Sequence, residues 1–212
     1  MDRQEAEKIF ETLYANVKGS SVSYQERERL KISDNKNFVY GEITFPTLAE
    51  LLDSLEPREG EQFYDLGSGT GKSTFIATLL YPFARCVGIE YLPALYQQSQ
   101  QILKEFEEKV PEKKEIINFI QGNILELNWE HADILYINAT CFDDNLWNKI
   151  VEKAHELKNG SRLIVTTQHI YSDQFEMIHD QSHQMSWGMN SVRVYKKQKA
   201  AQPAPQPALA ST

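Results

Sequence analysis

The chain has 212 residues, a formal net charge of −8 at pH 7 and 25% charged residues, a length that fits one domain with a single sizeable core. This acidic balance argues against a general nucleic-acid binder, because such proteins usually present a basic face to the phosphates. The chain has two cysteines, Cys86 and Cys141, and both lie in apolar stretches. This favours two buried thiols in a reducing compartment over a disulfide framework.

The N-terminal segment is charged from its second residue and lacks the apolar stretch of a signal peptide. Nowhere does an apolar run approach the ~20 residues that a helix needs to span a bilayer. We therefore expect a soluble protein inside the cell, most simply in the cytoplasm.

Two helices are expected in the first part of the chain. Residues 4–17 repeat apolar side chains on one helical stripe, so this helix should dock on a core. The polar residues 21–37 indicate at most a short helix followed by a loop. In residues 46–55, Pro46 opens a second helix, and four leucines form its apolar face.

From Gln62 onward, short apolar strands alternate with helices, which is the pattern of an α/β fold with a mostly parallel sheet. The expected strands are 62–66, 85–90, 117–121, 133–138 and 161–167. The expected helices are one that ends at Leu80, one over 93–109 and one over 145–157 that is ended by Gly160. Residues 175–181 and 191–197 alternate like an antiparallel C-terminal hairpin.

These elements divide the chain into three parts. We expect an N-terminal helical segment over residues 1–36 and one α/β domain over residues 37–199. Residues 200–212 are rich in alanine and proline, so we expect a disordered tail there.

The stretch DLGSGTGKST, residues 65–74, joins the first strand of the domain to its helix and ends like a nucleotide phosphate loop. A phosphate loop has a glycine five positions before its Gly-Lys pair, but that position holds Leu66. The dinucleotide fingerprint G-x-G-x-x-G fails as well, because the glycines alternate at positions 67, 69 and 71. Lys72 is therefore interpreted as a helix-surface lysine, and a different ligand is expected at the loop.

A glycine-rich turn lets the backbone approach a ligand closely and presents helix N-terminal amides to negative groups. Asp65 adds a carboxylate beside Gly67 and Gly69, and this mixture suits an amino-acid-like zwitterion. The second strand ends in Glu90, where an acid in a Rossmann-like unit accepts hydrogen bonds from ribose hydroxyls; alternatively, Glu90 caps the next helix. Joined to a methionine tail, such a nucleoside is S-adenosylmethionine, and the loop together with Glu90 predicts a class I, seven-strand, Rossmann-like methyltransferase core.

Asn123 and a pair of histidines also bear on ligand binding. Asn123 follows the third strand, where such enzymes often place an acid against the adenine amino group; its side-chain oxygen could accept that hydrogen bond, and an ordinary Gly-Asn turn is the open alternative. His179 and His183 have helical spacing in strand-like surroundings without further ligands, so we predict no metal site.

The segments VYGEITFPTLAELLDSL and QFYDLGSGTG resemble the non-SET histone-lysine methyltransferases, whose type member is the disruptor of telomeric silencing protein. ADILYINATCF and QMSWGMNSVRVY are similar to the family's fourth-strand asparagine segment and its terminal Ser-Trp region. The resemblance covers residues 38–195. The sequence departs from the family's pattern at Ile43, where a threonine is usual, at Asn123, and in having no basic extension of the kind that grips nucleosomal DNA.

The resemblance implies roles for the residues around the glycine loop. Tyr40 and Glu42 would lie on a loop that covers the methionine end of the cofactor, S-adenosylmethionine. Asp65, Gly67 and Gly69 would hold that end from below.

It also implies three roles further along the chain. Glu90 would bind the ribose, Asn138 would lie beside the channel through which the target lysine enters, and Tyr195 would form a wall of that channel. The predicted function is therefore S-adenosylmethionine-dependent methylation of a lysine on a protein partner. A small-molecule amine or an RNA base as acceptor, or a non-catalytic module that binds the cofactor, are the alternatives.

Overall fold

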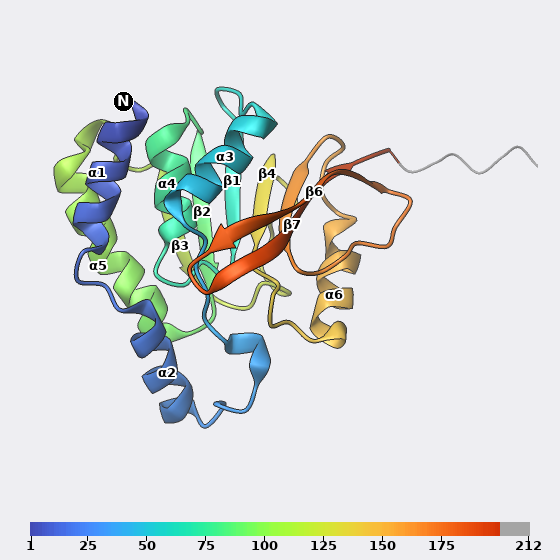
Figure 1. Cartoon of the computed structure of the whole chain (residues 1–212), viewed down its shortest axis with the longest axis horizontal. Helices are drawn as coiled ribbons and strands as arrows, with labels where there is room; N and C mark the ends of the chain where they lie inside the picture. Colours follow the sequence, from blue (N-terminus) through green and yellow to red (C-terminus); the bar gives the residue numbers. More distant parts are fainter. Residues whose placement is uncertain (200–212) are drawn as a thin grey trace, which may run out of the picture.

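The computed structural model describes residues 1–199, which are built around one seven-stranded sheet with the strand order β3-β2-β1-β4-β5-β7-β6 (Figure 1). The strands are β1 (Gln62–Leu66), β2 (Arg85–Glu90), β3 (Ile117–Gln121), β4 (Ile134–Ile137), β5 (Arg162–Thr166), β6 (Phe175–Met185) and β7 (Gly188–Lys197). The first five run parallel, while β7 pairs antiparallel with both β5 and β6. This confirms the predicted α/β fold with its antiparallel C-terminal hairpin.

Helices cover both faces of the sheet, and α6 lies well apart from α1 and α5 (Figure 1). The elements between and before the strands are α1 (Arg3–Tyr14), α2 (Gly19–Leu30), η1 (Lys36–Phe38), α3 (Phe45–Leu55), α4 (Lys72–Leu80), α5 (Pro93–Lys109), η2 (Pro111–Lys113) and α6 (Asp144–Ala154). One core cluster joins α1, α3, α4 and α5 to the sheet, and a second joins α6 to the opposite face. Because side chains alternate along each strand, neighbouring residues belong to different clusters.

The N-terminal helices differ slightly from expectation. Helix α3 begins one residue before Pro46, because the Thr44 hydroxyl accepts a hydrogen bond from the Thr47 N–H and caps it. Helix α2 has 12 residues, although the sequence indicated only a short helix; Lys31 ends it in a left-handed conformation. The weak apolar periodicity of this segment hides the helix from sequence analysis.

The end of α6 and the burial of Cys141 differ from expectation. Helix α6 ends at Ala154, and turns rather than helix lead to Gly160. Cys86 is buried as expected, but Cys141 is only partly buried. The disordered tail expected at 200–212 lies outside the described residues. In residues 1–199, no helix is both long and apolar enough to cross a membrane.

Candidate functional site

The glycine loop connects β1 to α4 at the edge of the sheet where the parallel strands end. Gly69 has a φ of 57°, and a Cβ atom there would lie 2.5 Å from Cε2 of Tyr40. Only glycine therefore lets the loop turn here while the Tyr40 ring rests on it. The Gly67 N–H donates to the Ile89 carbonyl at 2.8 Å, which ties the loop to the end of β2.

Glu90 ends β2 and lies buried against this loop. Its Oε2 accepts a hydrogen bond from the Gly69 N–H and its Oε1 accepts one from the Leu92 N–H, each at 2.7 Å. Burial raises the pKa of the carboxyl, and these backbone donors oppose the rise. Leu92 is the N-cap residue of α5, so Glu90 supports the start of that helix. It also lines the larger of two cavities, with lone pairs left for further donors.

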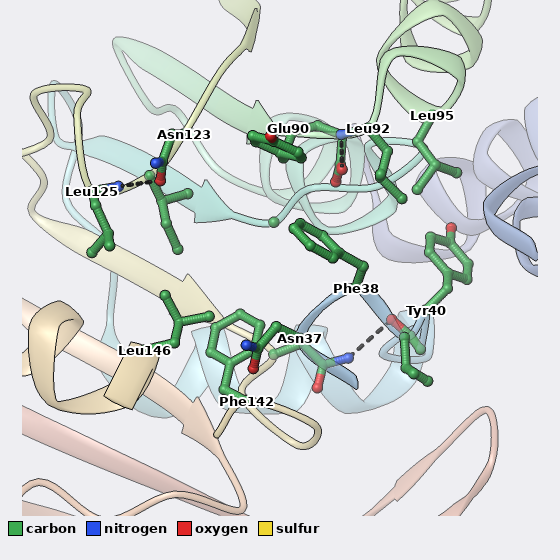
Figure 2. Close-up of a pocket in the computed structure, with 16 residues that line it drawn as sticks. Asn37, Phe38, Tyr40, Glu90, Leu92, Leu95, Asn123, Leu125, Phe142 and Leu146 are labelled. Atoms are coloured by element: carbon green, nitrogen blue, oxygen red, sulfur yellow. Dashed lines mark hydrogen bonds between the residues drawn. The ribbon is translucent and has the colours of Figure 1, made fainter. Parts of the chain in front are cut away.

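The larger cavity has a volume of about 300 Å³ and mostly apolar walls. The rings of Phe38 and Tyr91 stack with their centroids 5.1 Å apart. Leu95 from α5 lies beside Leu92 on the same side of the cavity as Glu90, and Phe142 lies on the opposite side, as Figure 2 shows. An apolar cavity with one carboxylate suits a nucleoside. Sequence analysis missed Phe38 and Tyr91, although each lies within two residues of a position that it had singled out.

Asn123 also lines the larger cavity, but its amide is used in a turn. Its Oδ1 accepts a hydrogen bond from the Leu125 N–H at 3.0 Å, and its Nδ2 donates to Glu126 Oε1 at 3.0 Å (Figure 2). The structure therefore has an Asn turn at this position. A contact from Asn123 to an adenine amino group stays a prediction, to be made through the remaining lone pair of Oδ1.

A segment that we call the lid, residues 39–43, crosses the glycine loop between η1 and α3. The Tyr40 hydroxyl lies 3.0 Å from the Thr70 hydroxyl and donates to Glu42. The Lys72 ammonium binds Glu42 Oε2 at 2.5 Å and lies 5.1 Å from the centroid of the Tyr14 ring. Lys72, expected as a helix-surface lysine, is the first residue of α4, and its partly buried side chain joins the lid to that helix through Glu42.

A second, smaller cavity lies between the lid and the glycine loop. The Ser68 and Tyr136 side chains line it, and both are buried, with 7% and 2% of their surfaces exposed. Neither hydroxyl has a hydrogen-bond partner among residues 1–199. Burying a hydroxyl without a partner costs free energy. These two groups therefore point to a polar ligand at this end of the site.

Asp65 is buried below the loop and lines neither cavity. Its Oδ2 accepts a hydrogen bond from the Thr74 hydroxyl at 3.3 Å. Burial raises the pKa of its carboxyl to about 7, while hydrogen bonds from Ser73 and Thr74 lower it and the Glu90 charge raises it further. Its side chain reaches back to the first turn of α4, and a direct contact between Asp65 and a ligand stays a prediction.

Asn138 follows β4 and lines both cavities. Its Nδ2 donates to the Gly41 carbonyl of the lid at 2.9 Å. The structure therefore brings Asn138 next to Tyr40, Glu42 and the glycine loop, as the sequence predicted.

Tyr195 does not join this group, and its expected role as a channel wall is wrong. Its ring lies in the core cluster on the α6 face of the sheet, and its hydroxyl accepts a hydrogen bond from the Ile170 N–H at 3.2 Å. The neighbouring Val194 and Tyr136 of β4 belong to the opposite cluster. The alternation of side chains along β7 thus turns Tyr195 away from both cavities.

His179 and His183 both lie on β6, with their Nε2 atoms 3.0 Å apart. Burial and the neighbouring His183 lower the pKa of His179. Throughout residues 1–199, no group of three or more histidine, cysteine or acidic side chains is placed to hold a metal ion.

Comparisons with known proteins point to one family. The family model described as "Histone methylation protein DOT1" matches residues 20–201. A histone-lysine N-methyltransferase of Debaryomyces hansenii, described as specific for H3 lysine-79, is 27% identical over 194 residues, covering 79% of this chain and 17% of its own length. The enzyme of the same description from Eremothecium gossypii is 33% identical over 138 residues, covering 60% and 24%.

A third relative has a different description. Trans-aconitate 2-methyltransferase of Enterobacter is 31% identical over 102 residues, covering 48% of this chain and 36% of its own length. The chain thus spans well under half of the length of each of these curated relatives.

Solved structures show the same fold. An RNA methyltransferase from Salinibacter ruber, crystallised with S-adenosyl-L-homocysteine, has a TM-score of 0.59 at 19% identity and covers 75% of this chain and 95% of its own. A tRNA methyltransferase of B. subtilis has a TM-score of 0.57 at 15% identity and covers 74% and 66%. At such low identity, these likenesses speak to the fold alone.

Proposed function

Because the chain belongs to the family of the histone methylation protein DOT1, we propose that it is an S-adenosylmethionine-dependent methyltransferase that methylates a lysine side chain of a protein. One observation carries this proposal. An apolar cavity that contains Glu90 adjoins a small polar cavity at the glycine loop, and four residues line both: Tyr40, Gly41, Gly67 and Asn138. A ligand with a nucleoside half and an amino-acid half matches that division.

The residues present fit this cofactor. Glu90 would accept hydrogen bonds from the ribose hydroxyls, and the apolar walls of the larger cavity would pack on the adenine ring. The hydroxyls of Ser68 and Tyr136, which have no partner within the described chain, would bind the polar groups of the methionine half. The bound cofactor supplies a methyl group on a sulfonium, which an amine can attack in line.

The protein's part in such a reaction is alignment and the exclusion of water. Among the described residues that line the two cavities, the carboxylates are Glu42 and Glu90, and both are engaged, one by Lys72 and the other by backbone N–H groups. Neither is free to act as a strong base. A lysine that enters between the lid and Asn138 would be desolvated, which lowers its pKa and favours the neutral, nucleophilic amine.

Calorimetric titration with S-adenosylmethionine tests the first step of this proposal. We expect saturable binding that Glu90→Ala weakens by at least about tenfold, because the variant loses the only buried carboxylate on the described wall of the larger cavity. Glu130→Ala, at a partly exposed residue that lines neither cavity, serves as the matched control. Absence of binding to the wild-type protein at millimolar cofactor would refute the proposal.

Transfer of a tritiated methyl group tests the acceptor. The relatives from Debaryomyces hansenii and Eremothecium gossypii are described as specific for H3 lysine-79, so nucleosomes and free histones are the first acceptors to try, followed by a total cell lysate. Label on protein that mass spectrometry assigns to lysine supports the proposal. The match to trans-aconitate 2-methyltransferase favours a small molecule as the second candidate, and label confined to the metabolite fraction would establish it.

A further inference from the structure

A chain of hydrogen bonds runs from the C-terminal half of the sheet to the lid. Thr167 Oγ1 donates to Asn190 Oδ1 at 2.8 Å, and Asn190 Nδ2 donates to Thr140 Oγ1 at 3.0 Å. Thr140 Oγ1 donates to Asn138 Oδ1 at 3.0 Å. The chain ends where Asn138 Nδ2 donates to the Gly41 carbonyl at 2.9 Å. Neither Thr140, Thr167 nor Asn190 lines either cavity.

Thr166, the last residue of β5, adds a second hydrogen bond to Asn138. It is completely buried, and its Oγ1 donates to Asn138 Oδ1 at 2.8 Å. Asn138 Oδ1 thus accepts two hydroxyl donors, which uses both of its lone pairs.

The orientation of the Asn138 amide follows from its two ends. Its Nδ2 faces the Gly41 carbonyl, which can only accept, so its Oδ1 faces the hydroxyls of Thr140 and Thr166. These two hydroxyls also lie 3.0 Å apart, and Thr167 Oγ1 lies 3.2 Å from Thr140 Oγ1, so the hydroxyls form one network around Asn138 Oδ1. A rotated Asn138 amide would turn its oxygen toward the Gly41 carbonyl, placing two acceptors face to face. The chain therefore fixes the amide with its NH₂ group toward the lid, and aligned hydrogen bonds of this kind strengthen one another.

The far end of the chain is strained. Thr167 has a φ of 65°, which is an unfavourable conformation for a β-branched residue. It is held there because its N–H donates to the Ser191 carbonyl at 2.9 Å and its carbonyl accepts from Arg193 at 2.6 Å. The surroundings thus impose this conformation, and it directs the Thr167 hydroxyl to Asn190.

We propose that Asn138 is a positioning residue, and that Thr140, Thr166, Thr167 and Asn190 hold its amide so that it keeps the lid closed over the cofactor. Gly41 lines both cavities, so the hydrogen bond to its carbonyl holds the lid at a residue shared by both halves of the site, in addition to the Lys72–Glu42 ion pair. The effect on the cofactor rests on the proposed function, whereas the effect on the lid does not.

The side chain of Trp187 lies against the lid and can report its movement by fluorescence. The ring of Trp187 lies so close to Gly41 that a Cβ atom there would meet Cζ3 at 2.7 Å. Trp187 is 42% exposed, whereas Trp129 and Trp147 are 1% and 5% exposed. Quenching of tryptophan fluorescence by acrylamide therefore reports mainly on Trp187, and displacement of the lid should uncover the face of its ring.

Thr166→Val keeps the volume of the side chain and removes one donor to Asn138. We expect stronger acrylamide quenching without cofactor and about fivefold weaker binding of S-adenosylmethionine by calorimetry, the effect of one hydrogen bond. Thr166→Ser should restore both. If methyl transfer is measurable, KM for the cofactor should rise while kcat changes little. Thr78→Val is the matched control, because Thr78 is equally buried but donates to Thr74 within α4.

Asn190→Ala provides a second, more exposed site of perturbation should Thr166→Val fold poorly. Equal quenching and equal cofactor affinity in wild type, Thr166→Val and Asn190→Ala would overturn the inference. If the wild-type protein binds no cofactor, the proposed function fails, but the quenching comparison still decides whether the chain holds the lid.

Discussion

Replacement of Asp65 by asparagine should stabilise the cofactor-free protein at neutral and alkaline pH. The carboxyl is 1% exposed, and burial raises its pKa from 3.8 to about 7. Well below pH 3.8 the carboxyl is protonated in both the folded and the unfolded state. As the pH rises from 4 to 7, the unfolded chain loses its proton first, so the folded state binds more protons and the free energy of unfolding falls.

The magnitude follows from the shift in pKa. About three units correspond to ~4 kcal/mol at full ionisation, an upper limit for the destabilisation by the Asp65 charge above pH 7. Asparagine has nearly the same shape, and its oxygen can still accept the hydrogen bond from Thr74. Asp65→Asn should therefore exceed the wild type in stability by roughly 2–4 kcal/mol at pH 8, and this difference should shrink as the pH approaches 4.

Urea denaturation of both proteins at several pH values between 4 and 8.5 measures this difference. Because Glu90 titrates in both proteins, subtracting the two curves isolates Asp65. A variant that is no more stable than the wild type at pH 8, or a difference that does not change with pH, would refute the reasoning. Since Asp65 lines neither cavity, Asp65→Asn should also weaken cofactor binding less than a change at Glu90.

Three further substitutions test the site. Glu90→Gln presents an NH₂ group to the N–H of either Gly69 or Leu92, so urea denaturation should show a loss of about 1–3 kcal/mol; unchanged stability would contradict the contacts described. In Gly69→Ala the added methyl group would clash with the Tyr40 ring, and the alanine would have to adopt the left-handed backbone conformation of Gly69. The melting temperature should therefore fall, and calorimetry should show loss of cofactor binding. Tyr136→Phe removes a buried hydroxyl that has no partner within the described chain, so the cofactor-free protein should melt no lower than wild type while its cofactor affinity falls; unchanged affinity would show that this hydroxyl meets no ligand.

Local features of the site could be predicted from the sequence. The glycine loop depends on residues that are neighbours in the chain, and Glu90 ends a strand that its own apolar residues define. The placement of Asn138 at the end of β4 follows from the same pattern. Each of these residues lies at or just after the end of a strand, and the apolar pattern of that strand shows in the sequence where the strand ends.

Contacts between distant segments could not be predicted in the same way. Lys72 was expected on a helix surface, but its partner Glu42 lies thirty residues earlier on the lid. Tyr195 was expected in a channel, but the pairing of β7 with β5 turns its side chain to the α6 face. A shift of one residue in that register would have turned it the other way, and in β7 both faces carry apolar residues, so the alternation alone did not show which face Tyr195 takes.

The sequence by itself thus determined the order of strands and helices, the glycine loop and the acid that ends β2, because these depend on periodicity and on the special geometry of glycine. Only the tertiary structure decided which side chains meet: the Asn138 amide at the lid carbonyl, 97 residues away in the chain, the ion pair of Lys72, and the burial that raises the pKa of Asp65. Hydrogen bonds and desolvation act over a few ångströms in space, so they depend on the packing of strands and helices and not on distance along the chain.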